Sequence, residues 1–212
     1  MESYVITISR KFASNGHAIA ARVSQLLGIP VYDRSAVEAR VSQLIPEEEE
    51  TADDLDLLDP SEPVSKSDTG ISLLKGLFRR ESRESVQDQG QIEFERQCRV
   101  IRDLAAEGPC IIIGRCADEI FLNDPRALHV YIYAPDEVRL KNSMEMLHTG
   151  EEEARALIQN EDRARDAYRK RFAKNAGDEI AGRHLLIDSG RFGVETSAKI
   201  LAQAAEYLFK EQ

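Results

Sequence analysis

The sequence has few cysteines, no long apolar run and no excess of basic residues. Its three cysteines, Cys98, Cys110 and Cys116, have the spacing of neither a disulfide framework nor a zinc site, and they indicate a reducing compartment. No stretch approaches the roughly 18 apolar residues that a membrane span requires. The opening residues also lack the basic and apolar regions of a signal peptide. We therefore expect a cytoplasmic protein with no membrane partner.

The negative charge of the chain is concentrated in one segment. The net charge over 212 residues is −10, and residues 46–62 hold nine acidic side chains and no basic one. Removing these nine charges leaves the rest of the chain at −1. A protein that binds duplex nucleic acid needs a basic surface to neutralise phosphates. The charge distribution therefore argues against a nucleic-acid partner.

The order of apolar segments predicts an α/β fold in one domain spanning residues 1–212. Short, nearly continuous apolar runs predict strands that are covered on both faces, at residues 4–8, 31–33, 110–113, 128–133 and 185–187. Helical patterns follow at residues 19–27, 36–45, 91–107, from 136, 149–174 and 194–209. Strands that alternate with helices predict a three-layer α/β/α fold with a central parallel sheet. Such sheets bind ligands at the carboxyl ends of their strands.

Residues 46–90 interrupt this regular order. They begin with the acidic run, continue through Pro60 and Pro63, and include serine-rich stretches. Only the apolar segment ISLLKGLF, at residues 71–78, suggests a helix that could dock on the domain. We interpret residues 46–90 as a partly irregular or helical excursion.

The loop SRKFASNG, from Ser9 to Gly16, joins the first strand to the first helix. At such a position, backbone N–H groups and the helix dipole can hold a phosphate. The common phosphate loop GxxxxGK[ST] supplies several glycines, a lysine and a hydroxyl, whereas this loop has one glycine and neither of the last two residues. The residues alone leave two interpretations open, a phosphate loop or an ordinary polar turn.

Two further positions come after buried strands at the expected ligand edge. Asp33 and Arg34 end the second strand, where they could face a ligand or form a solvated cap. Arg115 comes directly after the Ile-rich strand, and its guanidinium suits a phosphate bidentately. Asp118 could orient that arginine or cap the next helix. We interpret Cys110 and Cys116, which flank this position, as small core residues.

The helix at residues 149–174 begins with acidic residues and ends with basic ones. In its second half it carries the cationic residues Arg163, Arg165, Arg169, Lys170, Arg171 and Lys174. This order matches the helix dipole, as in an exposed helix with many salt bridges. It also matches a lid that offsets charge on a transferring phosphoryl group. The spacing favours neither interpretation, and it gives no reason to regard His129 or His148 as ligands.

Several motifs together resemble the cytidylate kinase-like family of the P-loop NTPase fold. They occur in the family's order and span nearly the whole chain: YVITISR (4–10), GIPVYDR (28–34), FERQCRVIRDLAAEGPCIIIGRCAD (94–118), HVYIYAP (129–135), EDRARDAY (161–168) and LLIDSGRFGVE (185–195). The most specific of them is IIIGRCAD. The resemblance implies a nucleoside monophosphate kinase-like fold with a mostly helical insertion.

The resemblance also implies a reaction and a set of site residues. The reaction is transfer of the γ-phosphoryl group of ATP, with Mg²⁺, to a pyrimidine nucleoside monophosphate such as CMP or dCMP. The donor loop would comprise Ser9, Arg10, Ala13, Ser14, Asn15, Gly16 and His17. Asp33, Arg34, Arg115, Asp118 and Arg169 would bind the acceptor, and Arg115, Arg163 and Arg165 would stabilise charge during transfer. Residues 46–90 would lie on the acceptor side, and residues from about 150 to 178 would form the lid.

The donor loop departs from the family pattern SRxxGSGGRxI. Ala13 and Asn15 stand where two glycines are expected, and His17 stands where an arginine is expected. These side chains narrow the approach of the backbone to a phosphate, and a histidine is mostly neutral at pH 7. Three functions are therefore open to test: an active nucleoside monophosphate kinase, a non-catalytic nucleotide-binding or regulatory protein, and a kinase for another small acceptor.

Overall fold

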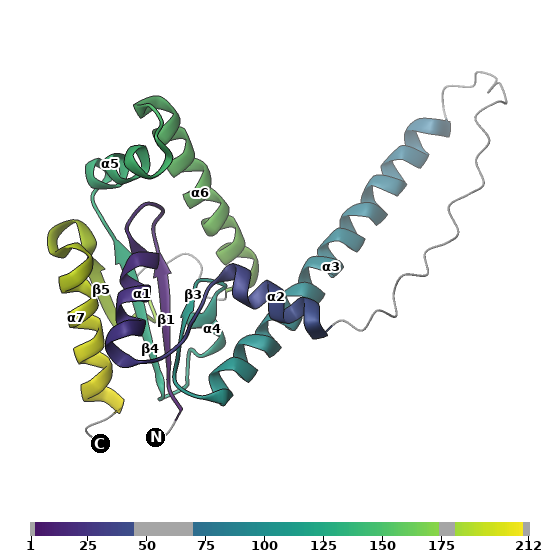
Figure 1. The fold of residues 1–212 in the computed structure, drawn as a ribbon. Helices are drawn as coiled ribbons and strands as arrows, with labels where there is room; N and C mark the ends of the chain where they lie inside the picture. Colours follow the sequence, from purple (N-terminus) through teal and green to yellow (C-terminus); the bar gives the residue numbers. More distant parts are fainter. Residues whose placement is uncertain (1–2, 45–69, 174–180, 210–212) are drawn as a thin grey trace.

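The computed structural model describes residues 3–44, 70–173 and 181–209 (Figure 1). Its sheet has five strands in the order β2-β3-β1-β4-β5, and every pair is parallel. The strands are β1 (Val5–Arg10), β2 (Val31–Tyr32), β3 (Cys110–Ile113), β4 (Ala127–Tyr133) and β5 (Leu185–Asp188). Because all strands run the same way, their carboxyl ends meet at one edge, toward α5 and α6 in Figure 1.

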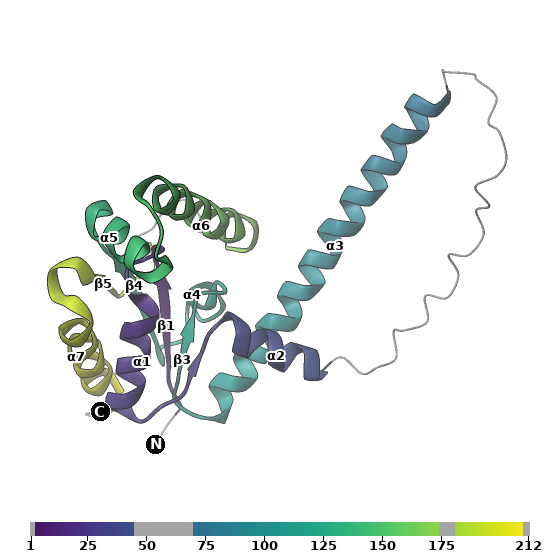
Figure 2. The same ribbon diagram turned by 45° about the horizontal axis from the view of Figure 1, so that its top comes forward.

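Seven helices are described, and they cover both faces of the sheet and its carboxyl edge (Figures 1 and 2). They are α1 (Gly16–Leu27), α2 (Arg34–Leu44), α3 (Gly70–Glu107), α4 (Ala117–Ile120), α5 (Asp136–Leu147), α6 (Glu151–Phe172) and α7 (Ser189–Phe209). Helix α7 is interrupted at Gly193, whose φ of 67° is not helical, so its long regular part begins where the sequence predicts it. The predicted three-layer α/β/α fold is confirmed.

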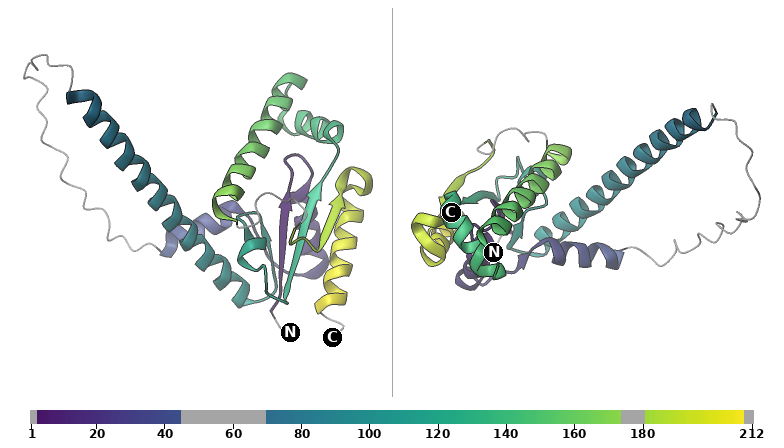
Figure 3. Two further views of the ribbon diagram at one scale, coloured as in Figure 1. Left: turned by 180° about the vertical axis from the view of Figure 1, so that it is seen from behind. Right: turned by 90° about the horizontal axis from the view of Figure 1, so that it is seen from above.

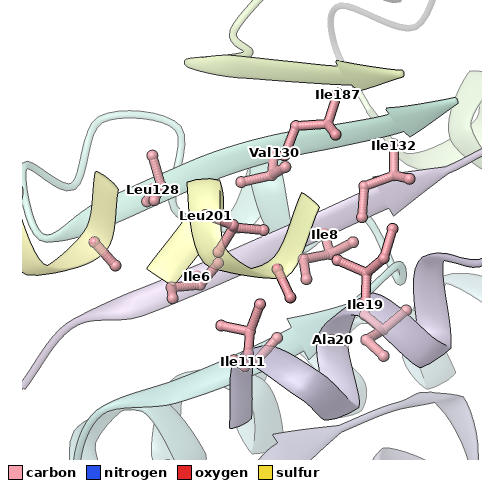
Figure 4. Packing of buried hydrophobic residues seen from close by; sticks show 14 of the residues in the cluster. Ile6, Ile8, Ile19, Ala20, Ile111, Leu128, Val130, Ile132, Ile187 and Leu201 are labelled. Carbon is pink, nitrogen blue, oxygen red and sulfur yellow. The ribbon is translucent and has the colours of Figure 1, made fainter. Parts of the chain in front are cut away.

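One hydrophobic cluster fills the space between the sheet and helices α1 and α7. Strand residues Ile6, Ile8 and Ile132 are each 0% exposed and pack against Ile19 of α1 and Leu201 of α7 (Figure 4). These residues point to one face because side chains alternate along a strand. Strand β1, at the centre of the sheet, is therefore fixed rigidly beneath the loop that extends from it.

A second cluster covers the opposite face of the sheet. Val5 and Ile112 pack there against Val37 of α2 and Ile101 of α3. The two clusters take alternate residues of the same strands, which is why the strands are apolar throughout rather than alternating. None of the described helices combines the length and apolar character needed to cross a bilayer.

Helix α3 is longer than the sequence predicts. The expected short helix at residues 71–78 is the beginning of a single helix that continues without a break to Glu107, and its first half extends away from the sheet (Figure 3). The arginine, glutamate and glutamine residues of this stretch are good helix formers, and a glycine inside a helix weakens it by about 1 kcal/mol without ending it. The expected helical insertion is therefore confirmed for residues 70–90, where the helix is longer than the one short helix that we expected. The acidic run at 46–62 lies outside the described residues.

Candidate active site

The loop between β1 and α1 adopts the backbone of a glycine-rich turn. Ala13 and Asn15 have φ values of 58° and 59°, in the left-handed region that favours glycine. Within the described residues, no hydrogen bond takes up the N–H groups of residues 13–17. Ala13 and Asn15 thus have glycine-like backbone conformations at the two positions where the family pattern has glycine, and the loop presents a set of donors at the helix N-terminus that suits an anion.

The carbonyl groups of the loop are held from outside. Asn142 of α5 donates to the Ala13 carbonyl at 2.9 Å, and Ser189 of α7 donates to the Ser14 carbonyl at 2.7 Å. The Ser14 hydroxyl donates to the carbonyl of Lys11 at 2.8 Å, so this predicted donor-loop residue acts through the backbone of the loop. The packing of the helices thus orients the peptide groups of the loop.

A cavity of about 340 Å³ opens beside this loop at the carboxyl edge of the sheet. Seven cationic and four acidic side chains line it, in a protein whose net charge is −10. The cationic residues are Arg10, Lys11, Arg34, Arg115, Arg165, Arg169 and Arg183, and the acidic ones are Asp118, Glu161, Asp162 and Asp166. The cationic surplus suits a ligand with several negative charges.

Arg10 crosses from the loop into the cavity. A Cβ at Gly16 would lie 3.0 Å from the Arg10 Cβ, and a Cβ at Gly114 would lie 2.4 Å from the Arg10 Nη1. Gly114 is thus required both by its φ of 75° and by the space that the guanidinium occupies. Burial, followed by the charge of Arg165, lowers the pKa of Arg10 to about 10, so that it stays cationic at neutral pH.

Several arginines of the cavity carry unsatisfied donors. Among the described residues, buried Nε atoms without a hydrogen-bond partner belong to Arg10, Arg115, Arg169 and Arg183. A buried donor without a partner costs about 1–3 kcal/mol. An anionic ligand in the cavity supplies the acceptors that such donors require.

Asp118 organises two of these arginines. Its carboxylate accepts hydrogen bonds from Nη1 of Arg169, at 2.7 Å, and from Nη1 of Arg183. Burial alone would raise the pKa of Asp118, but the charges and hydrogen bonds of Arg183 and Arg169 lower it overall. Ser9 also donates to this carboxylate at 3.4 Å. Asp118 thus orients Arg169 and Arg183. It does not orient Arg115, as one interpretation of the sequence suggested.

Arg115 has its own partner from the opposite side of the cavity. Its Nη2 donates to Glu38 of α2, and its guanidinium lies 5.3 Å above the ring of Tyr168. Burial raises the pKa of Tyr168 to about 12, and its hydroxyl donates to Gln97 at 3.1 Å. Arg115 and Cys116 both have positive φ values, 56° and 53°. The turn after β3 is therefore as unusual in conformation as the loop after β1.

The remaining predicted site residues are only partly brought together. Arg165 lines the cavity, where its Nη1 donates to the Arg10 carbonyl at 3.3 Å, whereas Arg163 is exposed and does not line it. Asp33 caps α2 by accepting the Ala36 N–H at 3.0 Å, the local interpretation that its sequence context also allowed. Arg34 lines the cavity rim and pairs with Glu38 at 2.8 Å.

His17 lies in the first turn of α1, where the charges of Arg10 and Asp33 affect its pKa. Partial burial and then the charge of Arg10 lower its pKa, while Asp33 opposes this shift. His17 is therefore mostly neutral at pH 7. The position keeps a hydrogen-bonding group but lacks the fixed positive charge that the family pattern has there.

Arg183 is a cavity residue that the sequence did not reveal. Its side chain is only 2% exposed, and the guanidinium lies 5.8 Å above the ring of Tyr131. It precedes the last strand and belongs neither to the acidic run nor to the basic end of α6. The sequence shows only an arginine shortly before a strand, and this pattern is too common to predict a cavity residue.

The three cysteines are buried, as interpreted from the sequence, and Cys116 also lines the cavity. Burial raises the pKa of Cys110 and of Cys116 to about 12, so both are protonated thiols at neutral pH. They have the character of small apolar residues. We assign them no part in chemistry.

The cavity does not offer its own ligand set for a divalent metal. No group of three or more histidine, cysteine, aspartate or glutamate side chains that could hold a metal occurs among the described residues. The most buried carboxylate, Asp118, is already bonded to guanidinium groups.

A larger hollow, of about 790 Å³, lies at the opposite, amino-terminal edge of the sheet. Ser3, Tyr4 and the turn at residues 119–126 line it, with Arg102 on α3. It contains none of the predicted site residues. The carboxyl edge is where parallel sheets bind ligands, so we place the active site in the smaller, cationic cavity.

An all-parallel sheet, a phosphate-type loop after its central strand and a cationic cavity at its carboxyl edge define an α/β protein of the P-loop NTPase fold. The comparison with protein families is more specific. The chain belongs to the cytidylate kinase-like family, whose family model matches residues 5–191. The resemblance found in the sequence motifs is thereby confirmed.

Solved structures share this fold at low sequence identity. A protein from Eubacterium ventriosum ATCC 27560, described as uncharacterized, has a TM-score of 0.69 and 19% identity over 96% of this chain and 98% of its own. TT1252 from Thermus thermophilus has a TM-score of 0.53 and 16% identity over 97% and 98%. At these identities the likeness concerns the fold alone. Among curated proteins, no match was found.

Proposed function

We propose that this protein is a phosphotransferase that moves the γ-phosphoryl group of ATP to a pyrimidine nucleoside monophosphate such as CMP or dCMP. The single observation that carries the proposal is the surplus of cationic side chains in the cavity beside the phosphate-type loop. Donor and acceptor phosphates bring several negative charges to one place, which a protein with a net charge of −10 accommodates only at a locally cationic site. Family membership supports the same class of reaction.

The geometry suggests a role for each part of the cavity. The loop from Ser9 to His17 would hold the donor phosphates through its free N–H groups. Arg115, at the end of β3, would bind the acceptor phosphate. Arg165 and Arg169, from α6, would approach the transferring group. Arg163 is exposed in this arrangement, so its predicted catalytic role would require α6 to move.

The transfer itself needs no protein nucleophile. An ionised oxygen of the acceptor phosphate attacks the γ-phosphorus, the bond between that phosphorus and the β,γ-bridging oxygen breaks, and ADP leaves with the bond pair. The acceptor becomes a nucleoside diphosphate, and no proton has to be removed from it. Arginines that neutralise the oxygens of the transferring group are sufficient for such a step.

Mg²⁺ would enter this reaction bound to the triphosphate rather than to a protein site. The described residues provide no carboxylate cluster for it, and the loop lacks the hydroxyl residue that commonly completes a phosphate loop. When bound, the ion would neutralise charge on the β- and γ-phosphates. We assign it no direct protein ligand.

The test is ADP formation from ATP and Mg²⁺ with CMP, dCMP or UMP as acceptor. We expect turnover with at least one of them, and a loss of about 100-fold or more in kcat/KM for Arg115→Gln, because one guanidinium on the reacting phosphates contributes that much. Arg155→Gln is the matched control, since Arg155 is exposed on α6, outside the cavity, and pairs with Glu151 at 2.8 Å. Absence of turnover with every monophosphate would count against a kinase.

A specific observation favours a second function, nucleotide binding without turnover. The donor loop keeps its glycine-like backbone but has Ala13 and Asn15 in place of glycine and a mostly neutral His17 in place of arginine. Binding would then persist through the loop N–H groups while charge neutralisation at the γ-phosphate is lost. A rise in melting temperature with ATP or CMP and no ADP formation would support this alternative.

A further inference from the structure

A closed ring of hydrogen bonds joins the lid helix, α5 and the donor loop at Phe12. Asp162 of α6 accepts the Phe12 N–H through Oδ1 at 2.8 Å, and its Oδ2 accepts Nη2 of Arg139 at 2.6 Å. Arg139, on α5, donates through Nε to the carbonyl of Phe12 at 3.0 Å. The N–H and the carbonyl of Phe12 are thus both hydrogen-bonded, and the two side chains that bind them form an ion pair with each other.

This ion pair is largely removed from water. The Arg139 side chain is 5% exposed and that of Asp162 is 17% exposed. Burying two charges costs several kcal/mol, which their attraction does not reliably return, so a packed apolar pair would stabilise the fold as well. The pair is better explained by the backbone that it holds in place.

The ring fixes the peptide group at Phe12, the first of three that set the direction of the donor N–H groups. In a trans peptide, the C=O of one residue and the N–H of the next point in opposite directions. Arg139, Asn142 and Ser189 hold the carbonyls of residues 12, 13 and 14 toward α5 and α7. The N–H groups of residues 13, 14 and 15 therefore face away from those helices, toward the interior of the loop where a phosphate would lie.

The same ring fixes the position of α6. Arg165 follows Asp162 by three residues, which places both on one face of the helix. Both line the cavity, as does Arg169 one turn further on. A shift of Asp162 along the loop would carry these arginines with it. The donor loop and the arginines of the lid are therefore held at a set distance through one carboxylate.

We infer that Asp162, together with Arg139, is a positioning pair that orients the donor-loop N–H groups and sets the arginines of α6 against them. This inference rests on the proposed function, because it concerns the binding of a nucleoside triphosphate in that loop. Asp162 takes no part in bond breaking. Its loss should weaken donor binding and slow transfer while leaving the affinity for the acceptor nearly unchanged.

The experiment compares Asp162→Asn with wild type and with Glu151→Gln, an exposed charge-neutralising change on the same helix. Asparagine keeps the size of the side chain but has one accepting oxygen in place of two, so it cannot accept from both the Phe12 N–H and Arg139, and it removes the charge that faces Arg139. We expect the KM for ATP, or its dissociation constant, to rise about tenfold and kcat to fall, since small misplacements near a reacting centre cost up to about 100-fold. The KM for the acceptor should change by less than about twofold, because residues that do not touch each other are coupled only weakly in energy.

A second measurement does not depend on turnover. Hydrogen exchange of single amides reports whether Phe12 and the loop N–H groups remain ordered in the free protein. We expect faster exchange of the Phe12 amide in Asp162→Asn and in Asp162→Ala, with wild-type rates in Glu151→Gln. If Asp162→Ala does not fold, Asp162→Asn alone decides the question.

The two proposals fail in different ways. Wild-type protein that binds no nucleotide would overturn the proposed function, and the exchange rates alone would then decide whether Asp162 positions the loop. Wild-type protein that binds ATP, with unchanged ATP affinity and Phe12 exchange in Asp162→Asn, would overturn the inference and leave the proposed function intact. A lower melting temperature with unchanged ATP affinity would likewise overturn it, because it would mark a purely structural pair.

Discussion

Residues of the two turns that follow β1 and β3 adopt backbone conformations that their side chains disfavour. Ala13 and Asn15 in the first turn and Arg115 and Cys116 in the second have φ values between 53° and 59°. Asparagine tolerates this region, but an alanine there costs about 1–2 kcal/mol. Contacts from α5 and α7 impose the conformation on the first turn. Such conformations concentrate at functional sites, where the surrounding structure holds them.

Replacing Ala13 by glycine should therefore relieve strain. We expect Ala13→Gly to be neutral or to raise the free energy of unfolding by up to about 1 kcal/mol, because the steric gain exceeds the entropy that glycine loses on folding. Ala21→Gly, at an exposed position inside α1, is the matched control and should lower it by about 1 kcal/mol. Urea unfolding of both variants checks the difference in sign. Equal losses in the two would show that Ala13 is not strained.

Sequence reasoning located cavity residues that lie at the ends of strands and missed those that depend on distant partners. Arg115 and the Ser9–Gly16 loop were found because the residues after a buried parallel strand emerge at the ligand edge. Asp162 and Arg183 were missed as site residues. Their roles come from partners 150 and 65 residues away, and no local pattern specifies such pairs. For Asp33 the sequence left two interpretations open, a residue that faces a ligand or a helix cap. The structure shows the cap, because the Asp33 carboxylate accepts the N–H of Ala36.

At the scale of elements, the carboxyl end of α6 is held to α3 by an aromatic cluster. Phe94 stacks on Phe172 with ring centroids 4.3 Å apart, and Tyr168 approaches Phe172 at 4.8 Å. The ring of Tyr168 also supports Arg115. The cluster therefore connects the docking of α6 to the position of the arginine proposed to bind the acceptor.

Removing Phe94 should loosen this end of α6. We expect Phe94→Ala to lower the free energy of unfolding by about 1–3 kcal/mol, less than for a fully buried ring because Phe94 is partly exposed. Trypsin should then cut several-fold faster after Lys170 and Arg171, at the end of the helix. The control is Ile92→Ala, since Ile92 lies on the same helix and is 49% exposed. Equal cleavage rates in the two variants would contradict the anchoring role of the cluster.

The elements themselves were largely predictable, and the exception has a physical cause. The five strands are short and apolar on both faces, which is a strong signal for a buried parallel sheet. Helix α3 was underestimated because residues 79–90, which follow the apolar segment at 71–78, lack a hydrophobic period, and sequence reasoning relies on that period to recognise helices. The helix propensity of these residues was sufficient to continue the helix, although they form no apolar face.

At the scale of the whole molecule, the two central strands β1 and β4, which lead to the carboxyl edge of the sheet, also share a polar contact inside the core. His129 of β4 is 0% exposed, and its Nε2 lies 3.2 Å from the carbonyl of Phe121. A carbonyl can only accept, so Nε2 carries a proton; because burial lowers the pKa of His129, Nδ1 is unprotonated at neutral pH and accepts the hydroxyl of Thr7 at 2.8 Å. His129 is therefore a neutral core residue, as interpreted from the sequence.

The stability of the whole domain should consequently depend on pH through His129. Burial and then the charge of His184 lower its pKa in the folded protein, while Asp118 opposes the shift. The unfolded chain then binds a proton near the ordinary value of about 6.5, at which the folded chain does not. Stability is thus complete above that pH and falls as the pH drops through it, by at most about 1.4 kcal/mol per pH unit for one group. His17, whose pKa is also lowered, adds a change of the same sign.

Urea unfolding between pH 7.5 and 5.5 isolates this effect, because the carboxylates with lowered pKa values, such as Asp118, lose their contribution only below about pH 4. His129→Asn should be less stable at pH 7.5 but show a smaller loss on acidification than wild type. Thr7→Val removes the hydroxyl that faces Nδ1 and retains the imidazole, so it should be less stable while keeping the full pH dependence. A wild-type slope in His129→Asn would assign the acid sensitivity to His17 or to groups outside the core, and the neutral histidine beneath the active-site edge would then have no part in it.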